Sequence, residues 1–366
     1  MILFLYIPFF LYVCIWIYLL IGFWKTYNRK QKSLDKELSI TIIIPFRNEI
    51  LRWDKLLSSL ESLDDSSCEL KIIFINDHSN DGGDKRLTEW VLSIEKDVSL
   101  LSLSDSAFGK KQAINLGVSN AVTDWIFTLD ADSYISSNFL NRFIKEMEDS
   151  ILLYLLPVLE NDKGFFLSKI ESIMLFNINY SSIGFHWPLL ANGAGMIFKK
   201  ETYINLDPYQ DNYDLSSGDD LFFLDKLMPN YRFYIKALKN QDLIVSTASP
   251  KCYSEMLSRA IRWSGKMKRV GLNRTLFIGL IVFLCNISLI PIVCFHLYHA
   301  YIQSLLAIIF LKLILDLWLL SLHHFNAINL RIIINVFLTF IFYPFHLLIV
   351  LSYSIFNHPK WKGRTI

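Results

Sequence analysis

The chain has 366 residues, of which 53% are hydrophobic and only 19% are charged. An average soluble domain carries about 25% charged residues, so this composition indicates membrane segments. The formal net charge of +2 gives no support to nucleic-acid binding, and the five cysteines, which lack any CxxC spacing, indicate neither a zinc site nor a disulfide framework.

The N-terminal segment, residues 1–24, contains no charged residue. A helix of this length can cross a hydrocarbon core of ~30 Å. It lacks the basic start and the small-residue cleavage site of a signal peptide, so we expect a transmembrane anchor. Residues 25–38 form a basic linker. By the positive-inside rule the linker stays in the cytoplasm, so the domain that follows it is also expected there. We expect an integral membrane protein, located in the plasma membrane.

Residues 39–250 alternate between strands and helices. Buried strands are predicted at 39–46, 69–77, 98–103 and 124–132, and helices at about 49–63, 84–95 and 109–120. This alternation implies an α/β domain with a mostly parallel sheet covered on both faces. Ligands of such sheets bind beyond the carboxyl ends of the strands. Polar residues gather there: Arg47, Asn48 and Glu49 after the first strand, Asp77 after the second, Asp130 and Asp132 after the fourth.

The C-terminal third is basic and then apolar. Residues 251–274 form a basic, partly amphipathic segment that suits an anionic membrane surface. Region 275–353 holds three apolar segments, near 275–297, 302–321 and 331–353, and a basic tail follows at 354–366. Four full spans would place that tail outside, against the positive-inside rule. One segment is therefore a candidate for a re-entrant or interfacial element, and Pro291 points to the first.

Asp130-Ala-Asp132 ends the fourth predicted strand. Two carboxylates separated by one residue can converge on one hard cation, Mg²⁺ or Mn²⁺, and link it to phosphate oxygens. Such an ion would neutralise a departing diphosphate. The alternative is an acidic turn, because Asp is favoured where strands end.

Two further motifs suit a nucleotide. In NDHSNDGG (76–83), Asp77 could accept from a base N–H, and the glycine pair permits a tight turn near a ligand. In GKKQAINLG (109–117), Lys110 and Lys111 stand at a helix start, where backbone N–H groups favour phosphate. A plain loop explains the first motif equally well, and a solvated basic face is the favoured interpretation of the second.

Two downstream motifs suit the reaction itself. In Ser217-Gly218-Asp219-Asp220 a carboxylate could act as a general base, although an acidic first helical turn fits equally well. Arg259 and Arg262 are three residues apart and share a helix face with Trp263 nearby. Arginine can grip phosphate and tryptophan can stack on a sugar ring, whereas the alternative is ordinary binding to the membrane surface.

The order of the motifs is more specific than any one of them. IPFRNE (44–49), NDHSNDGG, GKKQAINLG, DAD, NGAGMIFKK (192–200), SGDD, RAIRW and WKGR (361–364) follow one another along the chain. This order resembles the family 2 inverting glycosyltransferases, in particular membrane-bound polysaccharide synthases and ceramide glucosyltransferase. The resemblance implies the GT-A fold, a Rossmann-like nucleotide-sugar-binding domain, here with N-terminal and C-terminal transmembrane helices.

The resemblance also implies residue roles. Pro45, Arg47, Glu49, Asp77 and Lys110 would hold the nucleotide, with Asp77 on the base. Asp132 would be the principal metal ligand, Asp130 would bind the metal beside the donor sugar, and Asp220 would be the general base. The other expected substrate-binding residues are Gly193, Asp219, Arg259, Arg262, Trp263, Trp361 and Arg364. Arg259 replaces the glutamine of the family's QxxRW motif, which weakens the expectation of a long polymer product.

We therefore expect a membrane-bound hexosyl- or N-acetylhexosaminyltransferase of the cell envelope that uses Mg²⁺ or Mn²⁺ and a nucleotide-sugar, which the resemblance implies is a UDP-sugar. The expected acceptor is a lipid or a glycan. A processive polysaccharide synthase is the alternative within the family. A membrane-anchored nucleotidyltransferase and a non-catalytic scaffold are the alternatives from other classes.

Overall fold

The computed structural model describes residues 2–28, 37–160, 164–210, 212–213, 218–267, 273–322, 330–356, 360–361 and 364–365. Most of the predicted basic linker and Ser217 lie outside these ranges. The chain divides into two compact units. A helical unit consists of Met1–Asn28, Asp162–Leu189 and Ser249–Lys360, and an α/β unit consists of Arg29–Asn161, Leu190–Ala248 and Trp361–Ile366. The predicted catalytic region 39–250 is thus interrupted by a segment that packs within the helical unit.

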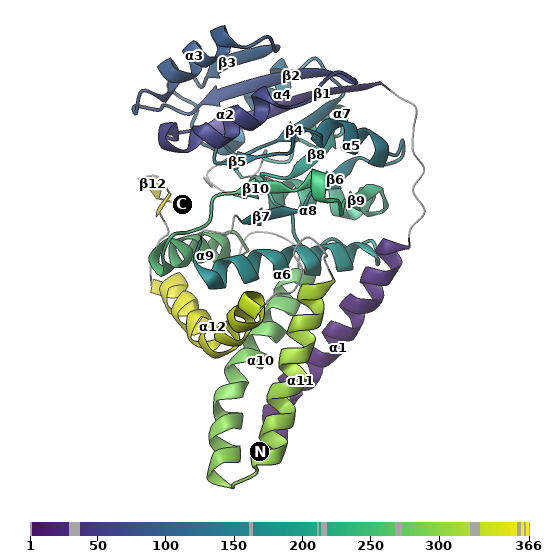
Figure 1. The fold of residues 1–366 in the computed structure, drawn as a ribbon, viewed down its shortest axis with the longest axis vertical. Helices are drawn as coiled ribbons and strands as arrows, with labels where there is room; N and C mark the ends of the chain where they lie inside the picture. The colour runs from purple at the N-terminus through teal and green to yellow at the C-terminus, as the bar shows by residue number, and fades with distance from the viewer. Residues whose placement is uncertain are drawn as a thin grey trace. The chain divides into compact units, whose positions relative to one another are not determined.

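A seven-stranded mixed sheet forms the centre of the α/β unit (Figure 1). Its order is β3-β2-β1-β4-β8-β6-β9. The strands are β1 Leu38–Phe46, β2 Cys68–Asn76, β3 Val98–Ser102, β4 Trp125–Thr128, β6 Leu153–Leu155, β8 Met196–Lys199 and β9 Ile235–Ala237. Strands β1 to β4 are parallel, as predicted, whereas β8 is antiparallel to both β4 and β6. This arrangement confirms the predicted GT-A-like α/β fold, with one reversed strand.

Strand β4 is shorter than the predicted strand 124–132. It ends at Thr128, and Leu129 makes one last ladder bond, from its N–H to the Ile43 carbonyl at 3.0 Å. A turn follows, closed by the Ser133 N–H on the Asp130 carbonyl at 3.0 Å. The aspartates therefore lie on a turn beyond the seven-stranded sheet, the kind of place where binding residues are commonly found.

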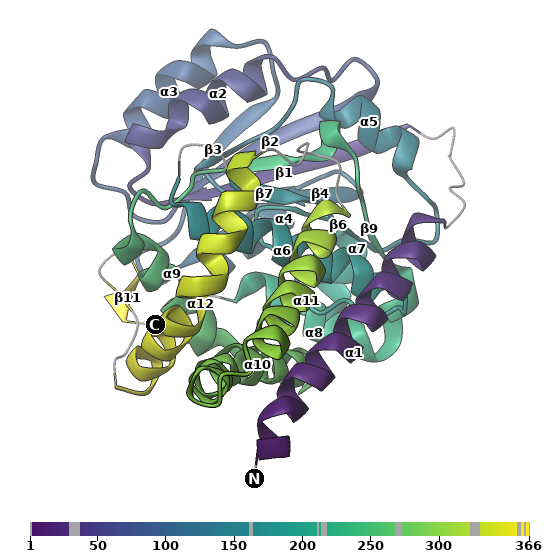
Figure 2. The same ribbon diagram turned by 60° about the horizontal axis from the view of Figure 1, so that its bottom comes forward.

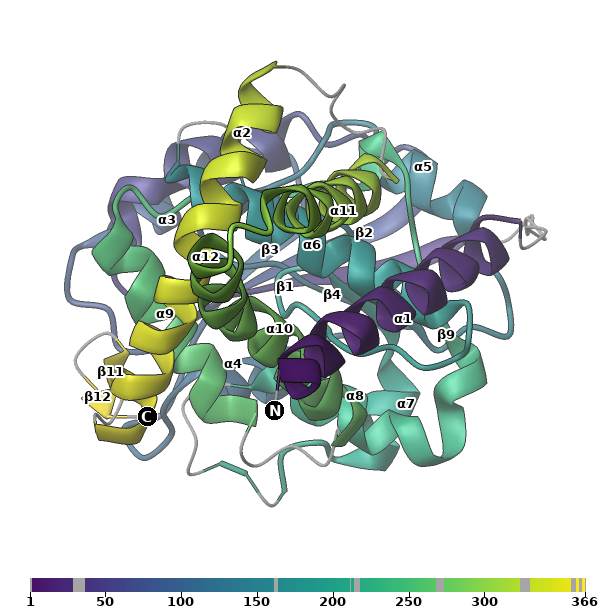
Figure 3. The same cartoon turned by 90° about the horizontal axis from the view of Figure 1, so that it is seen from below.

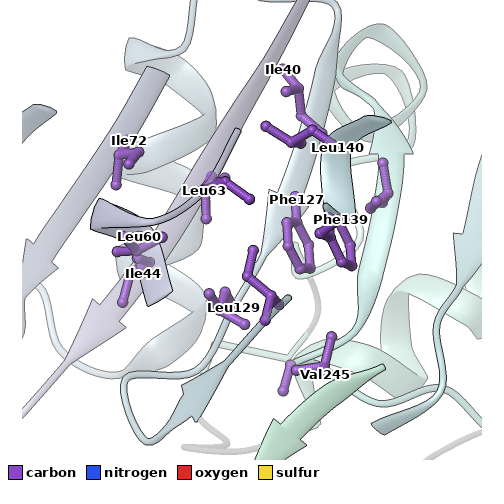
Figure 4. Close-up of a cluster of buried hydrophobic side chains, with 14 of the residues drawn as sticks. Ile40, Ile44, Leu60, Leu63, Ile72, Phe127, Leu129, Phe139, Leu140 and Val245 are labelled. Carbon is purple, nitrogen blue, oxygen red and sulfur yellow. The ribbon is translucent and has the colours of Figure 1, made fainter. Parts of the chain in front are cut away.

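Both faces of the sheet are covered, which explains the near-continuous apolar run of β1. Ile40 and Ile44 point to one face, where they meet residues of α2 Trp53–Glu61, α3 Gly83–Ser93 and α5 Phe139–Glu146 (Figure 4). Ile43 points to the other face, against α4 Lys110–Asn120. A Cβ on Gly117 would lie 2.8 Å from Ile43 Cγ2, so glycine allows this close helix–strand contact.

Smaller elements complete the α/β unit. Strands β5 Ser133–Tyr134, β10 Val245–Thr247 and β7 Val158–Glu160 form a second sheet in that order. The remaining helices of this unit are η1 Ile50–Arg52, α7 Lys200–Leu206, α8 Asp219–Tyr231, η2 Arg232–Tyr234 and η3 Gln241–Leu243. Of these, η1 begins directly after the predicted motif 44–49, and the first turn of α8 contains Asp219 and Asp220 of the SGDD motif.

The helical unit contains α1 Ile2–Tyr27, α6 Phe166–Ile183, α9 Tyr253–Met267, α10 Asn273–Tyr298, α11 Ile302–Ser321 and α12 Leu330–Phe356. Within the described part of the chain, four of these helices are long and apolar enough to cross a membrane. The candidate spans are Tyr6–Tyr27, Thr275–Tyr298, Ile302–Ser321 and Leu330–Tyr353, which match the four apolar segments predicted from the sequence.

Helix α10 runs unbroken through Pro291, so the re-entrant break that this proline suggested is not found. A tight turn joins α10 to α11, closed by the Tyr301 N–H on the His296 carbonyl at 2.9 Å. The two helices consequently lie side by side as an antiparallel pair (Figure 2). Helix α10 also packs against α1 and α12 (Figure 3), and α11 packs against the same two helices, so the four apolar helices form one bundle.

Helix α6 is packed closely against α1. A Cβ on Gly22 would lie 2.1 Å from the Ser181 carbonyl oxygen, and one on Gly184 would lie 2.0 Å from the Gly22 carbonyl oxygen. Small residues permit such close backbone contact between apolar helices. Next to this contact the rings of Tyr18 and Phe185 stack, with their centroids 4.1 Å apart. The glycine pair thus explains why 162–189 belongs with the helices rather than with the sheet.

A charged pair is buried within the apolar bundle. On α11, Lys312 Nζ lies 2.7 Å from Asp316 Oδ2, and the lysine is 3% exposed. The other carboxylate oxygen accepts from the Tyr12 hydroxyl of α1. Lys312 Nζ also lies 5.2 Å from the ring centroid of Phe340 on α12. Since both carboxylate oxygens are engaged, this cluster ties three apolar helices together.

We expect Asp316→Leu to lower the free energy of unfolding by about 3–5 kcal/mol, because it leaves a buried ammonium without its carboxylate. The double variant Lys312→Leu/Asp316→Leu should lose much less, since apolar side chains replace a buried ion pair at little cost. Unfolding of the detergent-solubilised proteins measures both values. Equal losses in the single and the double variant would contradict this account of the pair.

Candidate active site

Loops that leave neighbouring parallel strands meet at the carboxyl edge of the sheet. After β1, Asn48 adopts a left-handed backbone conformation with φ 53°, and after β2 His78 does so with φ 56°. The two loops bond each other: the Asn48 N–H donates to Ser79 Oγ at 3.1 Å and the Asn80 N–H donates to Asn48 Oδ1 at 2.9 Å. The loops that carry the first two predicted motifs therefore form one connected structure.

Asp77 lies between these loops and is 2% exposed. Its N–H extends the sheet by donating to the Phe46 carbonyl at 2.9 Å. Arg47 Nη1 donates to the Asp77 carbonyl at 3.2 Å and lies 3.8 Å from its carboxylate. Half-buried Pro45 precedes this pair on β1, in register with Ile75 of β2. The structure thus brings Pro45, Arg47 and Asp77 together at one corner of the edge.

The two aspartates of the DAD motif each lie near a different cation. Asp132 Oδ2 is 3.6 Å from Arg52 Nη1, and the same guanidinium is 3.4 Å from Glu49 Oε2. Asp130 Oδ1 is 2.7 Å from Lys110 Nζ. Arg52 was missed in the sequence because it is an isolated arginine in a helical segment. Only the turn after β4 brings Asp132 to it.

Lys110 links two motifs that are far apart in sequence. Its ammonium lies 2.7 Å from Asp130 Oδ1 and 2.9 Å from Asp219 Oδ2 at the start of α8. Burial lowers the pKa of Lys110, but the charges of Asp130 and Asp219 outweigh it, so the net shift is well upward. Lys110 is therefore a permanent cation between two carboxylates, as its predicted place beside a phosphate requires.

Gly193 of the NGAG turn borders this cluster. A Cβ at this position would lie 2.3 Å from Asp219 Oδ2 and 2.6 Å from Lys110 Nζ. The turn precedes β8, and β8 is antiparallel to β4, so the turn reaches the same edge as the loops after the parallel strands. The predicted residue Gly193 thus contacts Lys110 and Asp219 directly, and any larger side chain would displace them.

Asp220 is in the first turn of α8, next to Asp219. Its Oδ1 accepts from the Leu221 N–H at 2.8 Å, a position that the helix dipole favours for a carboxylate. The residue before the helix is Gly218, in a left-handed conformation with φ 98°. Asp219 is 4% exposed whereas Asp220 is half-buried, so Asp220 is the more accessible carboxylate.

Lys111 does not form the solvated basic face favoured from the sequence. It is 3% exposed, and its Nζ donates to the Asn212 carbonyl at 2.7 Å. Adjacent residues of a helix are about 100° apart around its axis, so the two lysines of the motif reach different surroundings. Lys110 faces the carboxylates and Lys111 faces the protein interior.

The residues fit a divalent ion of the Mg²⁺ or Mn²⁺ type. Asp130 and Asp132 offer hard oxygen ligands, and such ions are commonly held by one or two carboxylates together with substrate phosphates. Within the described ranges, no group of three or more His, Cys, Asp or Glu side chains could hold a metal by itself. The remaining ligands would therefore come from the donor and from water.

The other predicted residues are carried by other elements. Arg259, Arg262 and Trp263 are on α9 of the helical unit, where Arg259 Nη2 donates to Ser168 Oγ at 2.6 Å and lies 3.8 Å from Glu171. The guanidinium carbon of Arg259 lies 4.9 Å from the ring centroid of Trp263. Trp361 and Arg364 are in β11 Lys360–Trp361 and β12 Arg364–Thr365, which pair with each other. The side chains of these two residues lie outside the described part.

The α/β unit has a fold of the GT-A type. Residues 41–201 match the family described as Glycosyl transferase family 2. This part of the chain therefore carries a family 2 glycosyltransferase domain, which confirms the predicted resemblance, and the described part of the chain also contains four helices suited to membrane spans. A search of curated protein sequences finds no significant match.

Several solved structures are similar to this chain at low sequence identity. The mannosyltransferase PcManGT from Pyrobaculum calidifontis, in complex with GDP-Man and Mn²⁺, is 13% identical with a TM-score of 0.58, over 96% of this chain and 99% of that one. TarS of S. aureus in complex with UDP-GlcNAc is 16% identical with a TM-score of 0.44, over 62% and 66%. Glucosyl-3-phosphoglycerate synthase from Mycobacterium tuberculosis, in complex with Mn²⁺, uridine-diphosphate and glucosyl-3-phosphoglycerate, is 15% identical with a TM-score of 0.42, over 60% and 75%.

We expect Gly193→Ala to lower the rate of sugar transfer by about 10²-fold, because the methyl group displaces Asp219 and Lys110 from each other and misplacement by ~1 Å can have an effect of this size. The matched control is Gly279→Ala on α10, where a Cβ meets nothing within 4 Å. Initial rates of nucleoside diphosphate release measure both variants. A Gly193→Ala enzyme as active as the control would show that this close contact is dispensable.

Proposed function

We propose that this protein is an inverting glycosyltransferase of the plasma membrane that works on the cytoplasmic side. It transfers a hexosyl or N-acetylhexosaminyl group from a UDP-sugar to a lipid acceptor. One observation carries the proposal: Lys110, Asp130, Asp219 and Gly193 converge at the carboxyl edge of the sheet. The carboxylates can hold a metal ion for the donor diphosphate and accept hydrogen bonds from its sugar, and the buried cation keeps them in fixed places.

The corner at Asp77 is proposed to hold the nucleoside. A buried carboxylate can accept a hydrogen bond from a base N–H and so recognise that base, and Arg47 lies 3.8 Å from this carboxylate. Pro45 shapes the end of β1, and Glu49 shares Arg52 with Asp132. The nucleoside corner is thereby linked, through Arg52, to the proposed metal ligand.

Asp130 and Asp132 are proposed to hold Mg²⁺ or Mn²⁺. The ion, when bound, would supply positive charge to the diphosphate as it leaves. Lys110 contributes a second, permanent positive charge beside Asp130. Asp219 is proposed to bind the donor together with Lys110, and Gly193 has no side chain that would push this pair apart.

Asp220 is proposed to remove the proton from the acceptor hydroxyl. The hydroxyl oxygen then forms a bond to the anomeric carbon while the bond from that carbon to the diphosphate oxygen breaks. The proton ends on the Asp220 carboxylate and the nucleoside diphosphate departs with the electron pair. A single displacement of this kind inverts the anomeric centre, so an α-linked donor gives a β-linked product.

A lipid is the proposed acceptor because the chain joins a sugar-transferring domain to four apolar helices of span length. Arg259, Arg262 and Trp263 on α9 are proposed to act on the diphosphate and the acceptor, and Trp361 and Arg364 to close over the nucleotide. A growing glycan, made processively or not, is the second candidate. The family match favours transfer over the nucleotidyltransferase and scaffold alternatives.

Asp220→Asn should lower kcat by about 10²–10⁴-fold, because an amide cannot accept the acceptor proton. The KM for the donor should change little, since the amide keeps the size of the side chain. Asp225→Asn, further along α8, is the matched control and should retain wild-type turnover. Unchanged turnover in Asp220→Asn would remove this residue from the role of base.

A panel of UDP-, GDP- and dTDP-sugars should identify one donor whose nucleoside diphosphate is released only with divalent metal. Release should rise when a membrane lipid extract is added, because the extract contains the acceptor. It should fall by at least about 10²-fold in Asp132→Ala, which removes a proposed metal ligand. Labelled sugar found only in the aqueous phase would contradict a lipid acceptor.

A further inference from the structure

Lys111 is a buried cation that the proposed reaction does not use. It stands in the first turn of α4, directly after Lys110, and is 3% exposed. Its ammonium donates to the Asn212 carbonyl at 2.7 Å and lies 4.2 Å from the ring centroid of Phe222. The ring of Tyr209 is 5.7 Å away. A carbonyl and two aromatic faces therefore surround the charge.

Two of these partners, Tyr209 and Asn212, precede the proposed base in the chain. The Gln210 N–H donates to the Asp207 carbonyl at 3.3 Å, and the Asn212 N–H donates to the Tyr209 carbonyl at 2.9 Å. Lys111 donates to the carbonyl of Asn212. The Tyr209 hydroxyl in turn donates to the Asp219 carbonyl at 3.1 Å.

Phe222 connects the same cation to α8. Its N–H donates to the Gly218 carbonyl at 3.0 Å, within the first turn that carries Asp219 and Asp220. A Cβ on Gly218 would lie 2.7 Å from the Phe222 ring, so the ring packs against the start of the helix. Lys111 consequently contacts both sides of the helix start: the preceding loop through Asn212 and the first turn through Phe222.

Packing alone does not require an ammonium here. A methionine has a similar length and would fill the space without the desolvation penalty of a buried charge. A lysine adds a directed hydrogen bond and an attraction to ring faces, both of which depend on orientation. The directed hydrogen bond and the attraction to the ring faces can therefore fix the positions of Asn212 and of the start of α8.

We propose that Lys111 is a positioning residue that fixes the start of α8 and thereby the place of Asp220 relative to Lys110 and Asp130. The inference rests on the proposed role of Asp220 as the base. The two lysines contact different parts of this region. Lys110 forms an ion pair with Asp219, whereas Lys111 donates to the Asn212 carbonyl from the protein interior and contacts the first turn of α8 through Phe222.

Lys111→Met is expected to lower kcat by about 10–100-fold while the KM for the donor stays within about twofold, because the base moves and the nucleoside corner does not. Lys111→Arg should recover part of the loss, since it keeps a cation and a donor. The matched control is Lys200→Met, which removes another ammonium-to-carbonyl bond, to Ala121 at 2.5 Å, on α7. It should keep wild-type kcat.

The decisive comparison uses the Asp220→Asn background. If Lys111 acts through Asp220, Lys111→Met should add less than about twofold to the loss in Asp220→Asn. A full additional loss, or wild-type kcat in Lys111→Met, overturns the inference while the proposed base survives. An Asp220→Asn enzyme with normal turnover instead overturns the proposed function itself.

Tyr209→Phe is the milder second variant should Lys111→Met fail to fold. It keeps the ring and removes the hydroxyl, which donates to the Asp219 carbonyl and is also hydrogen-bonded to Tyr203. We expect the same pattern, a lower kcat at an unchanged donor KM, at about 3–10-fold because neutral hydrogen bonds are lost. Wild-type kcat in Tyr209→Phe would then overturn the inference.

Discussion

The ammonium of Lys110, buried between Asp130 and Asp219, is the interaction on which the rest of the active site depends. Two carboxylates near each other inside a protein are unfavourable unless a cation lies close by. The lysine supplies that cation and thereby holds three elements at one place: the turn after β4, the start of α4 and the start of α8. Gly193 is small for the same reason, since a methyl group would occupy the space of the ion pair.

The mixed sheet makes this convergence possible. Loops that follow parallel strands reach the carboxyl edge, which accounts for Arg47, Asp77 and Asp130. The NGAG turn precedes its strand and would lie at the opposite edge if that strand were parallel. Because β8 is antiparallel, the turn reaches the carboxyl edge and places Gly193 beside Lys110. One reversed strand is therefore required by the site.

The helical unit is held together by other kinds of contact than the α/β unit. Polar pairs lie between its helices or within them, as in the contact of Lys312 with Asp316 and of Arg259 with Ser168. Helix α6 is not one of the candidate spans, yet Gly22 and Gly184 bring it against α1 at van der Waals distance. Hydropathy detects helices that suit the membrane, whereas shape at a few small residues decides which other helix joins them.

The sequence by itself determined the elements whose signal is local. Apolar runs located the four candidate spans and β1 to β3, and the order of motifs identified the glycosyltransferase family and the residues that the edge of the sheet collects. The tertiary structure decided what depends on contacts between distant residues. It placed Arg52 between Glu49 and Asp132, turned Lys111 inward, ended β4 at Thr128 and moved 162–189 into the helical unit. Each of these outcomes is set by a partner more than 30 residues away or by a packing surface, and neither leaves a periodic pattern in the chain.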